Sequence, residues 1–180
     1  FKPGIDFYDQ GGQIGQALAL EQFAKTHHVS AVVLSIGGNN FQFSTILTDC
    51  VEDFVGTAGA TPSYCSKDPA LQQLFSASHV SQVESQIGGA IANITKALTK
   101  AGEKSSQYRI IVQNYPSPLP PGNLIRYPQR VHTRFDVGGC PLFDKDATWA
   151  NTTVVPTIDQ TVEDAVSASG LSNITYLDLS

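Results

Sequence analysis

The stretch from Ala31 to Asn40 constrains the fold more than any other part of the chain. Residues 31–36 form a nearly continuous apolar run, which is typical of a parallel strand covered on both faces. Gly37 and Gly38 follow this strand and allow the backbone to turn sharply and to approach a ligand closely. Asn39 then comes just past the carboxyl end of the strand, where open α/β sheets bind their ligands. Its side chain donates hydrogen bonds without carrying charge, which suits a developing oxyanion.

Helical and strand patterns alternate along the chain. Helical periodicity covers residues 13–27, 43–54, 80–101 and 156–169, and short apolar runs indicate strands at 31–36, 109–114 and 174–179. Residues 56–79 are irregular apart from a short helix around 69–75, and residues 115–150 form a long proline-rich loop of the kind that often shapes a binding site. The alternation predicts one α/β domain over residues 1–180, with a parallel sheet and right-handed crossovers.

The residues Gly37-Gly38-Asn39-Asn40, with the strand before them and Phe41-Gln42-Phe43 after them, form a recognisable motif. They resemble Gly-x-Asn-Asp, the third motif of the SGNH (GDSL-type) hydrolases, and look most like the secreted esterase and lipase branch of that family. The segments Phe1–Tyr8 and Val112–Pro120 resemble the same branch, so the likeness covers most of the chain. The resemblance implies a three-layer α/β/α fold with a flavodoxin-like parallel sheet, incomplete at both ends in this chain.

The resemblance also implies a serine-dependent hydrolase of carboxylic esters, and nothing in the sequence indicates a metal or an organic cofactor. In such an enzyme the Asn39 side chain donates to the tetrahedral oxyanion, while Gly37 and Gly38 let the backbone approach the acyl group. Asn40 and Phe41 are implied to contact substrate. Asn40 stands where the family has an Asp that braces the loop, so this departure concerns loop geometry more than chemistry. Without the resemblance, the same residues also fit an ordinary strand-to-helix turn with an asparagine cap.

Two motifs of the family are missing from the chain. It contains no Gly-Asp-Ser, which carries the family's nucleophile, and no Asp-x-x-His, which carries its base. We therefore interpret the chain as an internal piece of a longer protein and expect it to hydrolyse no ester by itself. The alternative is a binding or degenerate module that has kept the fold and lost catalysis. The flanking coding sequence distinguishes the two, since an enzyme would carry Gly-Asp-Ser before this chain and Asp-x-x-His after it.

Composition narrows the range of partners. The net charge of −5, from 11 basic and 16 acidic residues, argues against nucleic acid or an anionic membrane surface. No run of about 18 apolar residues occurs, so no transmembrane segment is predicted. The expected partner is an ester substrate, which is a lipid, a carbohydrate ester or a small molecule, and we expect a monomer.

The chain has three cysteines, and their positions predict one disulfide. Cys50 and Cys65 flank a turn-rich loop, and a bridge between them would add about 3 kcal/mol of stability in the chain-entropy model. Cys140 would then pair outside the chain or stay free. The alternative is three reduced thiols, two of them in the core. A disulfide favours an oxidising compartment and, with it, a secreted, extracellular protein.

Other residues are weaker candidates for a role in function. Three Asn-x-Ser/Thr sequons are compatible with secretion, at Asn93, Asn151 and Asn173. His132 is the one histidine that we place within reach of a site, and a surface role is favoured for it. Asp144 and Asp146 lack the ligand density of a calcium loop, so we expect both in a solvated loop. Three aromatic side chains either line a substrate groove or pin the long loop: Tyr127, Phe143 and Trp149.

Overall fold

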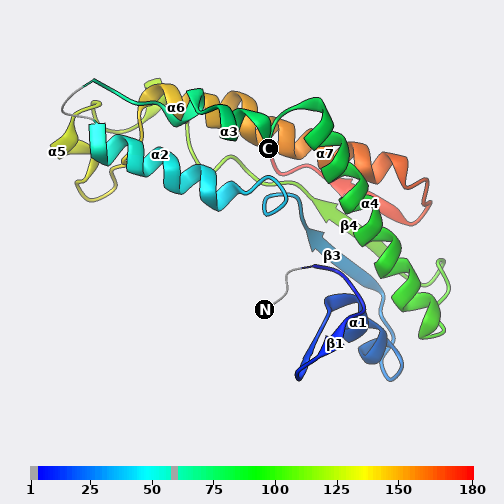
Figure 1. The fold of residues 1–180 in the computed structure, drawn as a ribbon. Coiled ribbons are helices and arrows are strands. Elements are labelled where there is room, and N and C mark those ends of the chain that lie inside the picture. Colours follow the sequence, from blue (N-terminus) through cyan, green and yellow to red (C-terminus); the bar gives the residue numbers. More distant parts are fainter. Residues whose placement is uncertain (1–3, 58–60) are drawn as a thin grey trace. The chain divides into compact units, whose positions relative to one another are not determined.

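The computed structural model describes residues 4–57 and 61–180, and for residues 131 and 132 it describes the backbone alone. The fold is mixed α/β (Figure 1). Contacts within the chain divide it into two units. The first contains the described residues up to 36 together with 84–114 and 162–179, and the second contains 37–83 and 115–161. Two helices, α4 (Ala77–Lys100) and α7 (Val155–Ala168), contribute residues to both units.

The first unit is built on a three-stranded parallel sheet. Its strands are β3 (Ala31–Ser35), β4 (Arg109–Gln113) and β5 (Ile174–Leu177), in the order β3-β4-β5. All three strands lie where the apolar runs predict them, and their parallel pairing confirms the predicted α/β class. Leu34 pairs with Val112, so the two side chains share one face of the sheet.

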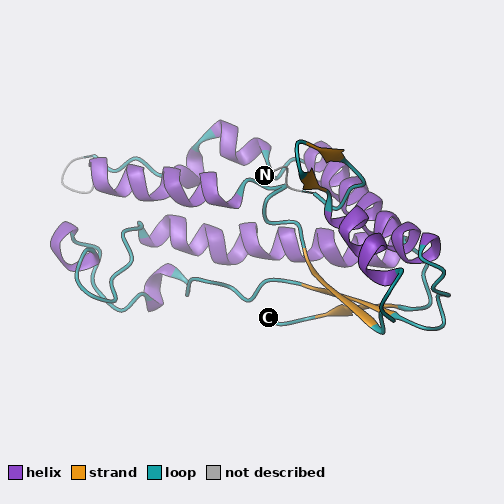
Figure 2. Ribbon diagram, turned by 90° about the horizontal axis from the view of Figure 1, so that it is seen from below, coloured by secondary structure: helices purple, strands orange, loops and turns teal. Residues whose placement is uncertain are grey.

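The two faces of this sheet differ in how they are covered. Leu34, Ile110 and Val112 are buried on one face, and the helices of this unit lie on one side of the strands (Figure 2). Helix α4 adds its own apolar stripe to this core, through Ile87, Ile91, Ile94 and Leu98. On the other face Val33 is 62% exposed. Helices on both faces, as a three-layer arrangement requires, are not seen in residues 4–57 and 61–180.

A small hairpin precedes the first helix, and the sequence pattern did not predict it. Strand β1 (Asp9–Gln10) pairs antiparallel with β2 (Gln13–Ile14). Gly11 and Gly12 form the turn between them with φ of 61° and 79°, which suits a two-residue hairpin turn. Helix α1 (Gln16–Ala24) therefore begins three residues later than its apolar pattern predicts.

The second unit consists of helices and connecting loops. Its elements, besides the first turns of α4 and α7, are α2 (Phe43–Thr57), η1 (Cys65–Lys67), α3 (Pro69–Gln73), η2 (Gly122–Leu124), α5 (Val131–Arg134), α6 (Asp144–Trp149) and the π-helical segment η3 (Ala150–Val154). Helices α2 and α3 confirm the sequence prediction. The prediction of one long loop over residues 115–150 is wrong, because η2, α5 and α6 lie within it. Each has at most six residues, which is too short for an apolar period to be visible.

A buried arginine holds this short-helix segment together. The Arg134 side chain is 1% exposed and forms an ion pair with Asp144. It also donates to the carbonyl oxygens of Leu142 at 3.2 Å and Pro128 at 3.3 Å. A buried cation is tolerated only when it is paired and hydrogen-bonded in this way. Arg134 therefore links residues 128, 142 and 144 of this segment through one side chain.

The predicted disulfide between Cys50 and Cys65 is confirmed. It joins α2 to η1, with 4.8 Å between the two Cα atoms. Phe143 packs beside this bridge region, with its ring 5.0 Å from that of Phe54 and 5.1 Å from that of Tyr64. Phe143 is 1% exposed, so it belongs to the core of the second unit.

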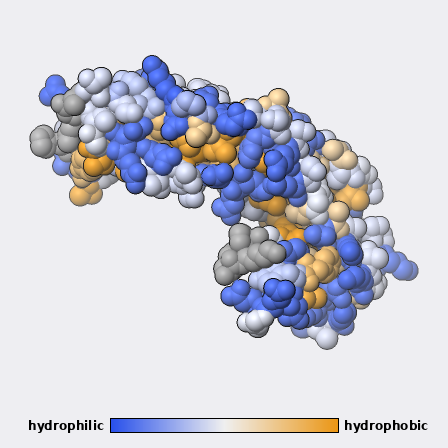
Figure 3. All heavy atoms as spheres, in the orientation of Figure 1, coloured by the Kyte–Doolittle hydropathy of each residue, from blue (hydrophilic) through white to orange (hydrophobic). Residues whose placement is uncertain are grey.

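The face of the molecule that Figure 3 shows is mainly hydrophilic, with separate hydrophobic patches. Val137 is the most exposed of the large hydrophobic residues, at 95%, followed by Leu124 at 66%. A search of the described residues finds no helix with the length and hydrophobicity needed to cross a membrane.

Candidate functional site

The turn that follows β3 has an unusual backbone. Gly37 has a φ of 112°, which residues with a side chain rarely adopt. Within the described part of the chain, Gln42 is the one residue other than glycine with a positive φ, at 53°. The N–H groups of Asn40 and Phe41 donate to the carbonyl oxygen of Gly37 at 2.9 Å and 3.2 Å and close the turn. Sparsely populated backbone conformations of this kind cluster at functional sites.

Asn39 lies in the middle of this turn with its side chain exposed. Its backbone carbonyl accepts a hydrogen bond from the N–H of Gln42 at 3.1 Å. Its side-chain amide forms no hydrogen bond with any residue that the structure describes, so Asn39 does not cap the following helix. The fold thus leaves a neutral donor at Asn39 available to a ligand.

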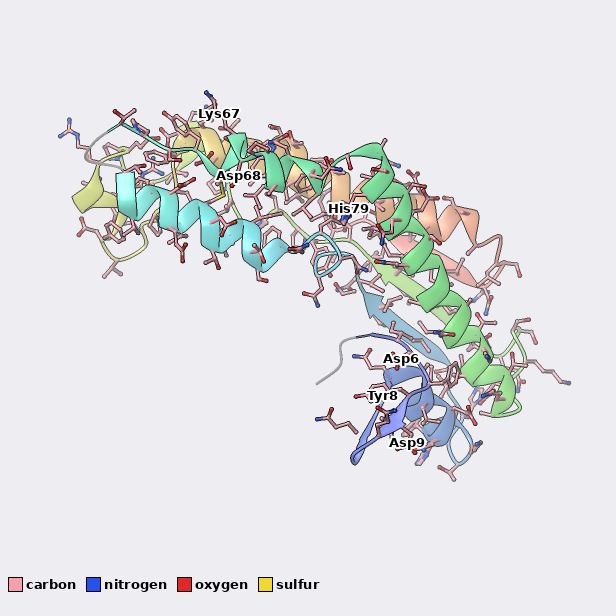
Figure 4. All side chains as sticks on the ribbon, viewed as in Figure 1. Asp6, Tyr8, Asp9, Lys67, Asp68 and His79 are labelled. Atoms are coloured by element: carbon pink, nitrogen blue, oxygen red, sulfur yellow. A yellow bond between two sulfur atoms is a disulfide. The ribbon has the colours of Figure 1, made fainter. Side chains whose placement is uncertain are left out.

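Phe41 and His79 fix the turn from behind. Phe41 is completely buried, with its ring 5.6 Å from that of Phe75 and edge-on to His79 at 5.7 Å. Nε2 of His79, which Figure 4 labels on α4, lies 3.3 Å from the carbonyl oxygen of Asn40 and donates to it. Trp149 packs edge-on against Phe75 at 5.6 Å. Phe41 therefore offers no surface to a substrate, and its observed role is to anchor the turn.

An apolar cavity of about 250 Å³ lies beside the turn. Three segments line it, namely Gly38 and Phe43 of the turn and α2, Tyr115 and Pro116 of the loop after residue 114, and Val155 and Ile158 of α7. Val155 and Ile158 are buried, whereas Pro116 is exposed. The cavity therefore runs from an exposed rim to a buried inner wall. A Cβ on Gly38 would lie 3.6 Å from the Tyr115 ring, so Gly38 belongs both to the turn and to the cavity.

Hydrogen bonds hold the loop that forms the rim of the cavity. Oδ1 of Asp159 accepts the N–H of Tyr115 at 3.2 Å. The side-chain amide of Asn151 donates to Oγ of Ser117 at 2.9 Å and to the carbonyl oxygen of Leu119 at 3.0 Å. Sequence reasoning expected this region to shape a site but missed these residues and His79. Only the closely spaced prolines that follow Tyr115 hint at a wall here.

Among the residues that the structure describes, the side chains of the other candidates form no hydrogen bond with the turn after β3 or with the residues that line the cavity. Asp146 is 1% exposed on α6 and accepts the N–H of Ser66 at 3.0 Å, so its predicted place in a solvated loop is wrong. Burial raises the pKa of the Asp146 carboxyl. Cys140 is half-buried and unpaired in the described residues, and burial raises the pKa of its thiol against the nearby charge of Arg134. The side chain of His132 lies outside the described part of the structure.

The described residues contain no candidate metal centre. Among residues 4–57 and 61–180, no group of three or more His, Cys, Asp or Glu side chains is placed to hold a metal ion. Of the remaining histidines, Nδ1 of His28 lies 3.0 Å from the Glu103 carboxylate. The ring of His27 stacks on that of Phe23 with 4.3 Å between centroids. Both are therefore engaged at the surface of the first unit.

The three sequon asparagines all have structural partners. Each uses Nδ2, the atom to which a glycan would be attached, to donate a hydrogen bond within the fold. The acceptors are the Ile5 carbonyl at 2.7 Å for Asn93, Ser117 and Leu119 for Asn151, and the Tyr108 carbonyl at 3.3 Å for Asn173. Asn173 is also 6% exposed. A glycan replaces one of the two Nδ2 hydrogens, so Asn151, which donates twice, would lose a hydrogen bond, and the burial of Asn173 leaves little room for a glycan.

The fold and this geometry were compared with known proteins. No protein-family model, no curated protein and no solved structure matches the chain.

Proposed function

We propose that this chain supplies the oxyanion-hole wall of a serine-dependent carboxylic ester hydrolase of the SGNH type. One observation carries the proposal. The Asn39 amide is exposed and forms no hydrogen bond with the described residues, and it lies on a turn whose backbone depends on Gly37. The apolar cavity beside Gly38 supports the same proposal, because an ester needs space for its acyl group next to the donor.

In the proposed mechanism a serine attacks the ester carbonyl and a histidine takes the serine proton. Negative charge then develops on the carbonyl oxygen, and the Asn39 amide donates a hydrogen bond to it. The donor is already held in place by the turn, so little reorganisation accompanies the reaction. The resemblance places the serine and the histidine on motifs that this chain does not contain, and the proposal assigns them to the rest of the full-length protein.

The proposal extends to the fold and to the cellular location. It assigns residues 1–180 to a single SGNH-type domain whose sheet has helices on both faces. The exposed Val33 face is consistent with a further layer, because parallel sheets are usually covered on both sides. The Cys50–Cys65 bridge supports a secreted protein, because disulfides persist in oxidising compartments.

The test uses the full-length protein and a series of p-nitrophenyl esters. We expect turnover that a serine-directed inhibitor abolishes and that Asn39→Ala lowers strongly. A full-length protein without esterase activity, or one that keeps full activity after Asn39→Ala, would contradict the proposal. In the first case the fold and its apolar cavity would favour a binding module that has lost catalysis.

A further inference from the structure

We infer that the cavity beside Gly38 selects esters with an acyl chain of about eight to ten carbons. This inference rests on the proposed function, because it names the substrate class of the same site. It separates the three kinds of ester that the sequence leaves open. Acetylated carbohydrates would leave the cavity mostly empty, and long-chain lipids would exceed it.

The wall of the cavity is mainly apolar, which favours an acyl chain over a sugar. Phe43, Val155, Ile158 and the proline rings expose carbon atoms to the cavity, and Tyr115 presents its ring toward Gly38. Asp159 also lines the cavity, and its carboxylate accepts the backbone N–H of Tyr115. An apolar group gains from entering such a space, whereas a sugar hydroxyl would lose its hydrogen bonds to water.

The volume of the cavity limits the size of the acyl chain. An engineered apolar cavity of about 150 Å³ accepts benzene, which has six carbons. At the same packing, the 250 Å³ observed here have room for about ten carbons. The inner wall is closed by the buried side chains of Val155 and Ile158, so these two residues set the length of chain that fits.

Gly38 connects the proposed donor to the cavity. It is the residue before Asn39, and it also lines the cavity. A carbonyl group held at the Asn39 amide would therefore direct its acyl chain along Gly38 toward Val155. A side chain larger than that of glycine at position 38 would narrow the entrance, because its Cβ would already touch the Tyr115 ring.

The test measures binding of straight-chain carboxylates, which are the acid products of ester hydrolysis, to the chain. Butyrate, hexanoate, octanoate, decanoate and dodecanoate are titrated while the amide NMR signals of Gly38 and Val155 are followed. We expect affinity to rise about threefold to fourfold per CH₂ up to about eight to ten carbons and then to level off, and the chain length at which it levels off is the optimum. Affinity that is flat across the series, or that still rises at dodecanoate, would overturn the inference.

Two neighbouring valines give a matched control. Val155→Ala removes two carbons from the wall and should move the optimum by about two carbons toward longer chains. Val154→Ala makes the same deletion at a buried residue that does not line the cavity, and it should leave the optimum unchanged. If Val155→Ala does not fold, Ile158→Val removes one carbon at smaller cost to stability and should move the optimum by about one carbon.

The binding assay also separates this inference from the proposed function. It requires no catalysis, so carboxylates that bind as expected in a protein without esterase activity would refute the proposed function and keep the site. Esterase activity that depends on Asn39, combined with carboxylates that leave Gly38 and Val155 unperturbed, would refute the site alone. An optimum that moves equally in Val154→Ala and Val155→Ala would also refute it.

Discussion

Two asparagines follow two parallel strands of this protein and are used in opposite ways. Asn39 comes after β3, is exposed, and forms no side-chain hydrogen bond with the described residues. Asn114 comes directly after β4, is 2% exposed, and uses both ends of its carboxamide. Its Nδ2 donates to Asp178 at 2.7 Å, and its Oδ1 accepts the N–H of Leu179 at 2.6 Å. The Asn114 carboxamide joins the end of β4 to the residues after β5, whereas the Asn39 carboxamide has no hydrogen-bond partner among the described residues.

The difference teaches that a polar residue at a strand end is not a site by position alone. Both asparagines satisfy the rule that ligands bind at the carboxyl ends of parallel strands. Burial and hydrogen bonding distinguish the two residues, because a buried amide must have its partners within the fold. An amide that the fold leaves unused, on a turn with unfavourable backbone angles, is the better candidate for catalysis.

The largest expected effect comes from removing the exposed amide. In the full-length protein, Asn39→Ala should lower kcat about a hundredfold to a thousandfold with little change in KM, because the lost hydrogen bond forms mainly in the transition state. Urea denaturation should give an unchanged free energy of unfolding, since the side chain contributes nothing to the core. Loss of folding in this variant would show that Asn39 is structural, and the contrast with Asn114 would fail.

Removing the buried amide should have the reverse pattern. Asn114→Ala deprives Asp178 and Leu179 of a hydrogen-bond partner, and the free energy of unfolding should fall by about 2–3 kcal/mol. The kcat of the molecules that remain folded should stay within about twofold of the wild type. Urea denaturation and active-site titration before steady-state kinetics measure the two quantities separately. A kcat that falls as far as in Asn39→Ala would mean that the two asparagines act on the same site.

The backbone of the turn gives a smaller effect. Gly37→Ala forces a side chain into a φ of 112°, which should cost about 1–2 kcal/mol of stability and misplace the Asn39 amide. Gly38→Ala is the matched control, because its new methyl group would make an ordinary contact with Tyr115 at 3.6 Å. We expect urea denaturation to leave Gly38→Ala within about 0.5 kcal/mol of the wild type. Equal losses in the two variants would show that φ at residue 37 does not hold the turn.

The sequence predicted the elements whose apolar pattern extends over many residues. The strands β3, β4 and β5 and the long helices follow from apolar periodicity, and the Cys50–Cys65 bridge follows from the turn-rich loop between the two cysteines. The hairpin before α1 was missed because four strand residues carry too little pattern. The short helices after residue 120 were missed because each has at most six residues, too few for an apolar period to be visible.

The candidate site could be predicted only where its residues are neighbours in sequence. Gly37 and Asn39 were identified from one decapeptide. The hydrogen bond of His79 to Asn40 joins residues 39 positions apart, and nothing local marks His79 as a partner. Tyr115 and Val155 meet at one cavity for the same non-local reason. Sequence reasoning thus proposed a donor at Asn39 and missed the cavity wall beside it.

The smallest expected effect tests which of two adjacent amides is the donor. The backbone N–H of Asn40 donates to Gly37 and its carbonyl oxygen accepts from His79, and both contacts survive Asn40→Asp. The new carboxylate has the same shape and keeps an acceptor, so kcat should stay within about threefold and the free energy of unfolding within about 0.5 kcal/mol. Asn39→Asp should instead lower kcat strongly, because a carboxylate would repel the oxyanion. Steady-state kinetics on both variants measures these effects. If Asn40→Asp lowered kcat more than tenfold and Asn39→Asp did not, the assignment would be reversed, because Nδ2 of Asn40 would then be the donor that the reaction needs.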